Sequence, residues 1–173
     1  EPPSGLAALG PKMLRLAATA ANGAHPYFSP VEHTAFARET MGKGAWLCTE
    51  QKVVLETDAS KARAAARASI AMYLELPNYR RSLKRFGITD DDFAAGGSDK
   101  LVDTVVAWGD EKAIDARRLL KTLVLAEDDL RRIFDVHGAG DFAADEFLVA
   151  LERGDHRRHV VAAERHHIDD GSL

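Results

Sequence analysis

The stretch Val53-Val54-Leu55-Glu56-Thr57-Asp58 carries the clearest strand signal in the chain. Three consecutive aliphatic residues, two of them β-branched, are typical of a buried β-strand. Asp58 is a good N-cap residue for the Ala-rich helix expected over 59–76. A strand that runs directly into a capped helix is the repeating unit of a parallel α/β fold.

Two similar units precede this stretch. The small apolar segment 5–9 is followed by Gly10-Pro11-Lys12, where Pro favours the first turn of a helix. Asn22-Gly23 is expected to end that helix with glycine in the left-handed conformation. A second strand is expected at 24–28, and Ser29-Pro30-Val31-Glu32 has the pattern of a capping box with Ser29 as the N-cap. The alternation predicts a sheet of about three parallel strands, at 5–9, 24–28 and 46–56.

The segments after Thr57 are all expected to be helical. A second helical stretch is expected at 78–86, and Ser98 is expected to cap a helix over 99–108. Another helix is expected to begin at Glu111. The helix at 99–108 carries an apolar face that requires a covering surface: Leu101, Val102, Val105 and Val106. Together with the open edges of a partial sheet, this face predicts marginal stability or self-association.

Length and composition exclude several classes of protein. The chain has 173 residues, too few for a complete (β/α)8 barrel of about 250. The net charge of −4 gives no basic excess for a nucleic-acid partner. No apolar run approaches the ~18–20 residues that span a bilayer, so no membrane partner is expected. One cysteine, Cys48, excludes an intrachain disulfide, and together with the absence of a leader pattern at the first residues it favours a cytoplasmic location.

Charge divides the chain into two unequal parts. Residues 1–123 contain 17 Lys+Arg and 15 Asp+Glu, whereas residues 124–173 contain 6 and 12. Five of the seven histidines also lie at or after position 137. Such a shift indicates segments of different origin.

The segment Gly10-Pro11-Lys12 is a candidate anion site. A helix N-terminus offers unpaired backbone N–H groups and the positive end of the helix dipole to a phosphate. The competing interpretation is an ordinary turn between a strand and a helix. His25-Pro26-Tyr27-Phe28 lies at the end of the second expected strand, where barrel enzymes place functional residues. His25 is either a functional group or a buried or half-buried histidine with a backbone partner. His33 is expected on the surface of its helix.

Metal sites are not expected. His156 and His159 share a helical face and His166-His167 follow, but neighbouring arginines disfavour a cation and a solvated face is the better interpretation. Asp90-Asp91-Asp92 lacks EF-hand spacing and is better read as helix capping. Cys48 is expected to be a small buried side chain rather than a nucleophile.

Residues from Leu6 to about Leu120 resemble the luciferase-like flavin and deazaflavin oxidoreductases, most closely the group that uses deazaflavin coenzyme F-420. The resemblance covers about two-thirds of the chain in the expected order. The stretches that carry it are Leu6-Ala7-Ala8-Leu9-Gly10-Pro11-Lys12-Met13, Asn22-Gly23-Ala24-His25-Pro26-Tyr27-Phe28 with Pro30-Val31-Glu32-His33-Thr34, Glu50-Gln51-Lys52-Val53-Val54-Leu55-Glu56-Thr57-Asp58, and Leu76-Pro77-Asn78-Tyr79-Arg80 with Gly97-Ser98-Asp99-Lys100-Leu101-Val102-Asp103 and Ala107-Trp108-Gly109.

This resemblance implies an α/β fold, namely the C-terminal half of a TIM (β/α)8 barrel. It implies hydride transfer between coenzyme F-420, or alternatively FMN, and a small organic substrate; some relatives are monooxygenases. The implied cofactor-binding residues, with Lys12 added for its charge, are Ala7, Ala8, Leu9, Gly10, Pro11 and Lys12. The family's usual catalytic positions lie in the other half of the barrel, so no catalytic residue is assigned.

Two hypotheses follow. In the first, residues 1–121 are the C-terminal half of a luciferase-like barrel, and 122–173 are a divergent helical tail from a frameshifted or fused gene. Such a chain is expected to be a fragment that binds cofactor weakly and is inactive alone; its expected partners are a small-molecule substrate and either the missing N-terminal barrel half or further copies of itself. In the second, the chain is a non-catalytic helical interaction module, or a decayed gene product, built on barrel remnants.

Overall fold

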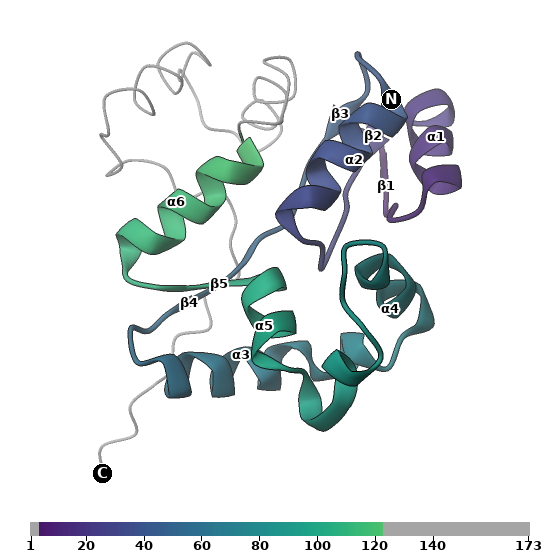
Figure 1. Ribbon diagram of the computed structural model, residues 1–173. Coiled ribbons are helices and arrows are strands. Elements are labelled where there is room, and N and C mark those ends of the chain that lie inside the picture. The colour runs from purple at the N-terminus through teal and green to yellow at the C-terminus, as the bar shows by residue number, and fades with distance from the viewer. Residues whose placement is uncertain (1–3, 123–173) are drawn as a thin grey trace.

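The computed structural model describes residues 4–122, which form two packed regions (Figure 1). The first region contains a parallel sheet of β1 (Gly5–Leu6), β2 (Gly23–Ala24) and β3 (Trp46–Leu47), in that order. The second contains a parallel pair, β4 (Lys52–Leu55) and β5 (Val106–Gly109). The expected mixed α/β fold with parallel strands is confirmed. The described strands form two separate sheets and do not close a barrel.

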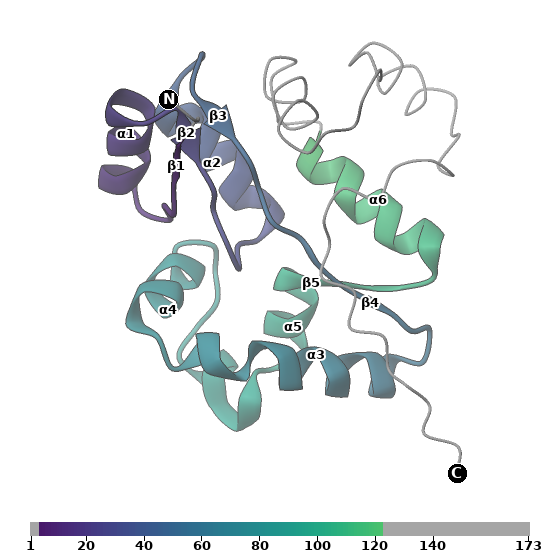
Figure 2. The same cartoon turned by 180° about the vertical axis from the view of Figure 1, so that it is seen from behind.

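Two helices cover the first sheet, α1 (Pro11–Ala20) and α2 (Val31–Met41). Both lie beside β1–β3 in the front and rear views (Figure 2). Their shared core consists mainly of small side chains, which let the helices approach the short strands closely. Its buried members are Ala8, Leu14, Ala17, Ala24, Ala37, Met41 and Leu47.

Gly23 has a different role from the expected one. The prediction that it ends α1 in the left-handed conformation is wrong, because Gly23 lies inside β2, between Gly5 of β1 and Trp46 of β3. A Cβ atom on Gly23 would lie 2.2 Å from the Trp46 carbonyl oxygen. Glycine is therefore required there by the close approach of two backbones rather than by its dihedral freedom.

The start of α2 also differs from the expectation. Pro30, not Ser29, is the N-cap residue, and no side chain caps the helix. The Ser29 hydroxyl is buried and has no hydrogen-bond partner within the described residues, so the expected capping box does not form. The backbone at Phe28 has a φ of 50°, and this sharp turn brings the chain from β2 into the helix.

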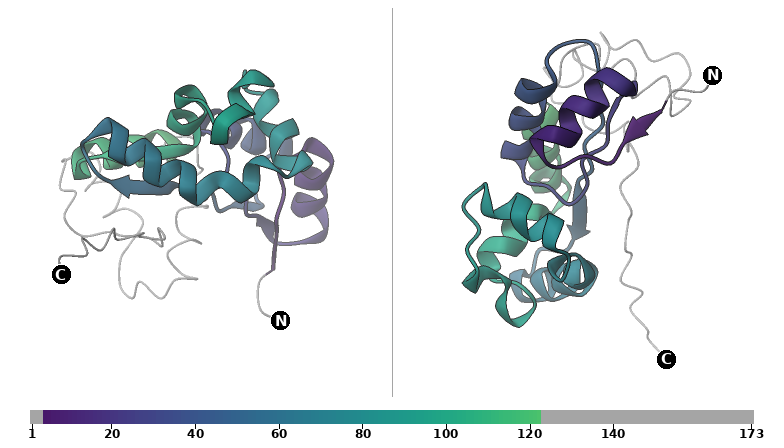
Figure 3. Two further views of the ribbon diagram at one scale, coloured as in Figure 1. Left: turned by 90° about the horizontal axis from the view of Figure 1, so that it is seen from below. Right: turned by 90° about the vertical axis from the view of Figure 1, so that its right-hand side faces the viewer.

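The second region is built around α3 (Ala59–Leu74). Asp58 caps α3 by accepting a hydrogen bond from the Lys61 N–H, as the sequence predicts. The other elements are α4 (Pro77–Lys84), a 3-10 helix (Asp91–Gly96), α5 (Asp99–Val105) and α6 (Glu111–Thr122). Figure 3 shows the same elements from below and from the side; α3, α4 and α5 lie at the end of the molecule opposite α1.

The strand β5 contradicts the expectation that every segment after Thr57 is helical. Ser98 does cap α5, but the helix ends at Val105 and the next four residues extend along β4. The pairing runs from Lys52 opposite Val106 to Leu55 opposite Gly109. Valines spaced for a helix face also suit a strand, and here the pairing with β4 decides between the two. The strand expected at 46–56 is likewise divided between the two sheets.

The apolar face of α5 and β5 is covered by the chain itself. Leu101, Val102, Val105 and Val106 are buried among side chains of α3 and of the 3-10 helix. The expected covering surface is therefore supplied by the chain itself, so this face gives no reason to expect self-association. Other large apolar side chains are exposed: Met13, Leu16, Leu55, Met72, Leu76 and Leu120.

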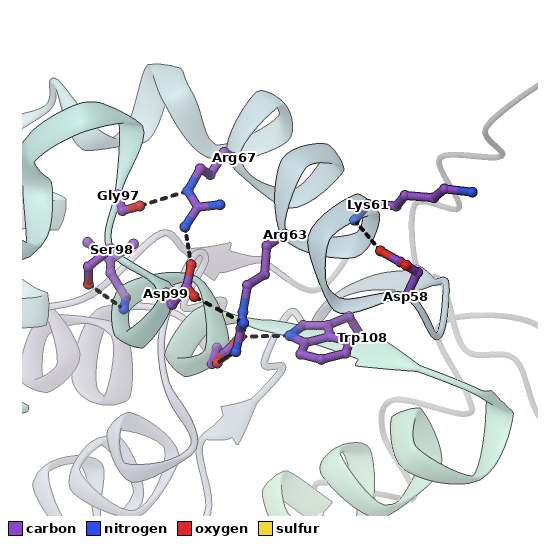
Figure 4. A network of polar contacts seen from close by, with 10 residues as sticks. Asp58, Lys61, Arg63, Arg67, Gly97, Ser98, Asp99 and Trp108 are labelled. Atoms are coloured by element: carbon purple, nitrogen blue, oxygen red, sulfur yellow. Dashed lines mark hydrogen bonds and ion pairs between the residues drawn. The ribbon is translucent and has the colours of Figure 1, made fainter.

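An ion-pair network joins α3 to α5 and β5 (Figure 4). The Arg63 guanidinium donates to both Asp103 carboxylate oxygens, at 3.1 and 2.6 Å, and pairs with Asp99 at 3.0 Å. Arg67 also pairs with Asp99 and donates to the Gly97 carbonyl at 2.8 Å. The Trp108 indole N–H donates to Asp103 at 2.7 Å. The network fixes the direction in which β5 leaves α5.

No helix within residues 4–122 combines the length and the apolar character needed to cross a bilayer.

Candidate functional site

The carboxyl ends of β1, β2 and β3 lead into the segments that carry most of the candidate groups. In parallel α/β folds, functional side chains gather at this edge, because all strands end on the same side. Here the three segments are residues 7–10, 25–30 and 48–51. The described structure therefore places the sequence-derived candidates Gly10 and His25 at the same edge of one sheet.

The segment after β1 leaves the N-terminus of α1 uncapped. Gly10 occupies the N-cap position and provides no side-chain hydrogen bond, and the first turn contains no acidic residue. A Cβ atom on Gly10 would meet no other atom within 4 Å, so there is open space at this end of the helix. Unpaired N–H groups, a favourable dipole and open space are what a phosphate requires.

The six residues implied by the family resemblance differ in exposure. Ala8 is buried in the core beneath α1, whereas Ala7 and Lys12 are exposed. Leu9, Gly10 and Pro11 are half-buried. Ala8 therefore contacts the core, and the other five residues are at least partly exposed.

His33 is buried, so its expected surface position is wrong. Its Nε2–H donates to the Leu9 carbonyl oxygen at 2.9 Å, and its ring packs edge-on against Phe36 and Phe86. Burial lowers the pKa of His33, with Lys121 and Arg85 adding to the effect and the Leu9 hydrogen bond opposing it. His33 thus holds the segment before α1 in place from α2.

His25 is exposed and has a backbone partner. Its Nδ1 lies 2.8 Å from the Cys48 carbonyl oxygen, and because a carbonyl only accepts, Nδ1 carries the hydrogen. The contact fixes the ring between the ends of β2 and β3. Cys48 itself is half-buried.

A cluster of ionisable side chains that the sequence did not predict forms around Tyr27, which follows β2. Lys52 Nζ donates to the Tyr27 hydroxyl at 2.9 Å, and the Tyr73 hydroxyl donates to the same oxygen at 3.2 Å. Tyr79 packs edge-on against Tyr73 with ring centroids 5.3 Å apart. The members come from the segment after β2, from β4, from α3 and from α4, so no spacing in the sequence reveals them.

Glu50 adds a carboxylate to this cluster. Its Oε2 accepts a hydrogen bond from the Phe28 N–H at 3.1 Å. Burial raises the pKa of Glu50, although Lys121, Lys52 and the Phe28 hydrogen bond oppose the shift. A carboxyl group whose pKa is raised in this way is better suited to exchanging a proton near neutral pH than an exposed carboxyl group.

Lys121 of α6 contacts the backbone of the segments beside this cluster. Its buried Nζ donates to the carbonyl oxygens of Ser29 at 2.8 Å and Glu50 at 2.7 Å. Burial lowers the pKa of Lys121 to about 8, while the Glu50 carboxylate opposes the shift. One side chain thus holds together the segments that follow β2 and β3.

Some of the residues considered as metal ligands lie within residues 4–122, and others lie outside the described residues. Across residues 4–122, no group of three or more His, Cys, Asp or Glu side chains is arranged to hold a metal ion. Asp92 accepts hydrogen bonds from Thr89 and Ser98 and pairs with Lys100, as expected for local capping. His156, His159, His166 and His167, and the proposed tail 122–173 beyond its first residue, lie outside the described residues.

Comparison with known proteins yields a similarity of fold. No protein-family model and no curated protein sequence matches the chain. A similar solved structure is the coenzyme F-420-dependent tetrahydromethanopterin reductase from Methanopyrus kandleri, with a TM-score of 0.56 and 19% sequence identity. The match covers 70% of this chain and 42% of that enzyme, so the chain corresponds to less than half of its length. The described part therefore shares the α/β arrangement of part of that enzyme.

Proposed function

We propose that this chain is part of a luciferase-like oxidoreductase that transfers a hydride between deazaflavin coenzyme F-420, or FMN, and a small organic substrate. The observation that carries the proposal is the uncapped N-terminus of α1, at the carboxyl end of β1, in a fold similar to that of an F-420-dependent enzyme. The family resemblance of residues 6–120 supports the same assignment.

The donor set fits a phosphate-bearing cofactor. The N–H groups of the first turn of α1 would bind the phosphate, with Gly10 giving it room and Lys12 adding a positive charge. Such a cofactor supplies a hydride when bound. The helix end contributes on the order of 1 kcal/mol from its dipole, plus charge-assisted hydrogen bonds. We therefore expect the chain alone to bind with millimolar affinity, about −4 kcal/mol.

Catalysis requires more than this site. The reacting atoms must be held about 3–3.5 Å apart, and we propose that the remaining walls come from an N-terminal barrel half. We accordingly expect binding without turnover by this chain, turnover when that half is supplied, and a cytoplasmic location. Homo-oligomerisation is the alternative way to complete the walls.

The test is a fluorescence titration of the purified chain with oxidised coenzyme F-420, and in parallel with FMN. The variants are Gly10→Val, which fills the space at the helix end, and Lys12→Glu. Lys112→Glu is the matched control, because Lys112 is the exposed second residue of α6 as Lys12 is of α1.

We expect Lys12→Glu and Gly10→Val each to weaken binding by about tenfold, the equivalent of 1.4 kcal/mol. Lys112→Glu should leave the affinity unchanged. Equal affinity in all four proteins, or no binding at millimolar cofactor, would refute this cofactor site.

A further inference from the structure

The three tyrosines of the chain all lie in one cluster, and the hydroxyl of one of them donates a hydrogen bond to the hydroxyl oxygen of another. Tyr27 follows β2, Tyr73 lies near the end of α3, and both are half-buried and thus in contact with solvent. Lys52 lies on β4 and reaches both rings, with Nζ at 5.1 Å from the Tyr27 centroid and 5.2 Å from the Tyr73 centroid.

The Tyr27 oxygen accepts two hydrogen bonds of unequal character. Lys52 donates from a charged ammonium at 2.9 Å, and Tyr73 donates from a neutral hydroxyl at 3.2 Å. Both bonds become stronger when the accepting oxygen is negative, so both favour the phenolate form of Tyr27. The positive charge beside the oxygen is the larger of the two effects.

Other charged and titratable groups surround the pair. Glu50, between β3 and β4, interacts electrostatically with Lys52 and Tyr79. Its carboxylate accepts a hydrogen bond from the Phe28 N–H, and its backbone carbonyl accepts one from Lys121 of α6. His25, on the same segment as Tyr27, has its ring centroid 6.4 Å from the Tyr27 ring. Tyr79 of α4 contacts Tyr73, and mainly through burial its pKa is raised. Within residues 4–122, Lys52 is thus a cation bonded to the Tyr27 oxygen.

We propose that Tyr27 is the catalytic acid–base residue of the hydride transfer, that Lys52 and Tyr73 are its positioning residues, and that the substrate is a ketone or an aldehyde. The identity of the hydride donor rests on the proposed function. A hydride added to carbon leaves its electron pair on a neighbouring atom, and a carbonyl oxygen is the atom that a phenol can protonate.

A C–H bond of the hydride donor breaks, and the donor is oxidised by two electrons. The carbonyl carbon gains that hydride and forms a C–H bond, while the π electron pair of the C=O bond moves to oxygen. That oxygen takes the Tyr27 hydroxyl proton and forms an O–H bond, which gives an alcohol. The Tyr27 phenolate is stabilised by the Lys52 ammonium and regains a proton from solvent. In the opposite direction the phenolate removes the alcohol proton.

The experiment is a pH titration of the folded chain with carbon-13 at the phenol ring carbon of tyrosine, followed by NMR. Three signals are expected, and Tyr27→Phe, Tyr73→Phe and Tyr79→Phe assign them. We expect the Tyr27 midpoint to lie about one pH unit or more below the ordinary tyrosine pKa of about 10. Lys52→Met should raise the Tyr27 midpoint by about one unit, Tyr73→Phe by less, and Lys52→Arg should retain most of the effect. Lys43→Met, at an exposed lysine ahead of β3, is the control and should change nothing.

The outcomes separate this inference from the proposed function. A Tyr27 midpoint at or above the ordinary tyrosine value of about 10 overturns it, as does a midpoint that neither Lys52→Met nor Tyr73→Phe changes. If Lys52→Met does not fold, Lys52→Arg and Tyr73→Phe decide the same question. The titration needs no cofactor, so its result does not depend on the proposed cofactor site. A low Tyr27 midpoint in a chain that binds neither F-420 nor FMN would support the role of Tyr27 and refute the proposed cofactor.

Discussion

The two regions of the molecule are held together in different ways. The region of β1–β3 has a core dominated by alanines, and its precision depends on backbones in close contact, as at Gly23 and Trp46. The region of β4, β5 and α3 has a core of large aliphatic and aromatic side chains and is tied by ion pairs such as that of Arg63 with Asp103. The first region presents the helix end proposed to bind a phosphate, and the second supplies Lys52 and Tyr73. The candidate site therefore depends on both.

The largest effect is expected from Gly23→Ala in the first region. The added Cβ would overlap the Trp46 carbonyl, so β2 and β3 must separate. We expect a loss of about 3 kcal/mol or more in the free energy of unfolding, measured by urea denaturation. Gly10→Ala is the matched control, because no atom lies within 4 Å of its added Cβ. Its expected loss is no more than about 1 kcal/mol, since alanine is a poorer N-cap residue than glycine. Similar denaturation midpoints for the two variants would contradict the close contact.

A smaller, pH-dependent effect is expected from Lys121, which joins the regions. Its folded pKa of about 8 lies below the ordinary value of 10.5 for lysine, because burial favours the neutral amine. Between these values the unfolded chain binds the proton and the folded chain does not. Stability due to this group therefore rises with pH from about 8 to 10.5, and the penalty is fully present below 8.

Lys121→Met isolates the contribution of Lys121. The wild-type chain should gain up to about 3 kcal/mol relative to the variant between pH 8 and 10.5, measured by denaturation at each pH. The difference between the two proteins cancels the titration of the other groups. A constant difference across this range would show that folding does not lower the pKa of Lys121.

The smallest stability effect is expected from Arg63→Met in the second region. Burial alone would raise the pKa of Asp103, but the hydrogen bonds from Arg63 and Trp108 outweigh it and lower the pKa. Because the side chains are partly exposed, we expect only a small loss in the free energy of unfolding. The loss should be present at neutral pH and disappear as acid protonates Asp103 below its ordinary pKa. Arg63→Lys keeps the charge but loses the two-pronged contact. Its free energy of unfolding should lie between those of the wild-type chain and Arg63→Met.

The sequence predicted the strand–helix alternation of residues 5–76 and the caps at Asp58 and Ser98, because these signals are local. It did not predict β5, since Val105 and Val106 suit a helix or a strand equally well and only the neighbouring β4 decides. It predicted the wrong environment for His33, whose partner Leu9 lies 24 residues away. The cluster of Tyr27, Lys52 and Tyr73 was missed for the same reason: its members meet only through the fold.

The most direct measurement of the central claim is a backbone amide NMR titration of the whole chain with oxidised coenzyme F-420. If the phosphate binds at the end of α1, the amide signals of Gly10, Lys12 and Met13 should move together with a millimolar dissociation constant. The first turn of α6, which begins with Glu111, should not respond. Amide signals of α1 that stay unchanged while others move, or an absence of any change at saturating cofactor, would contradict the account.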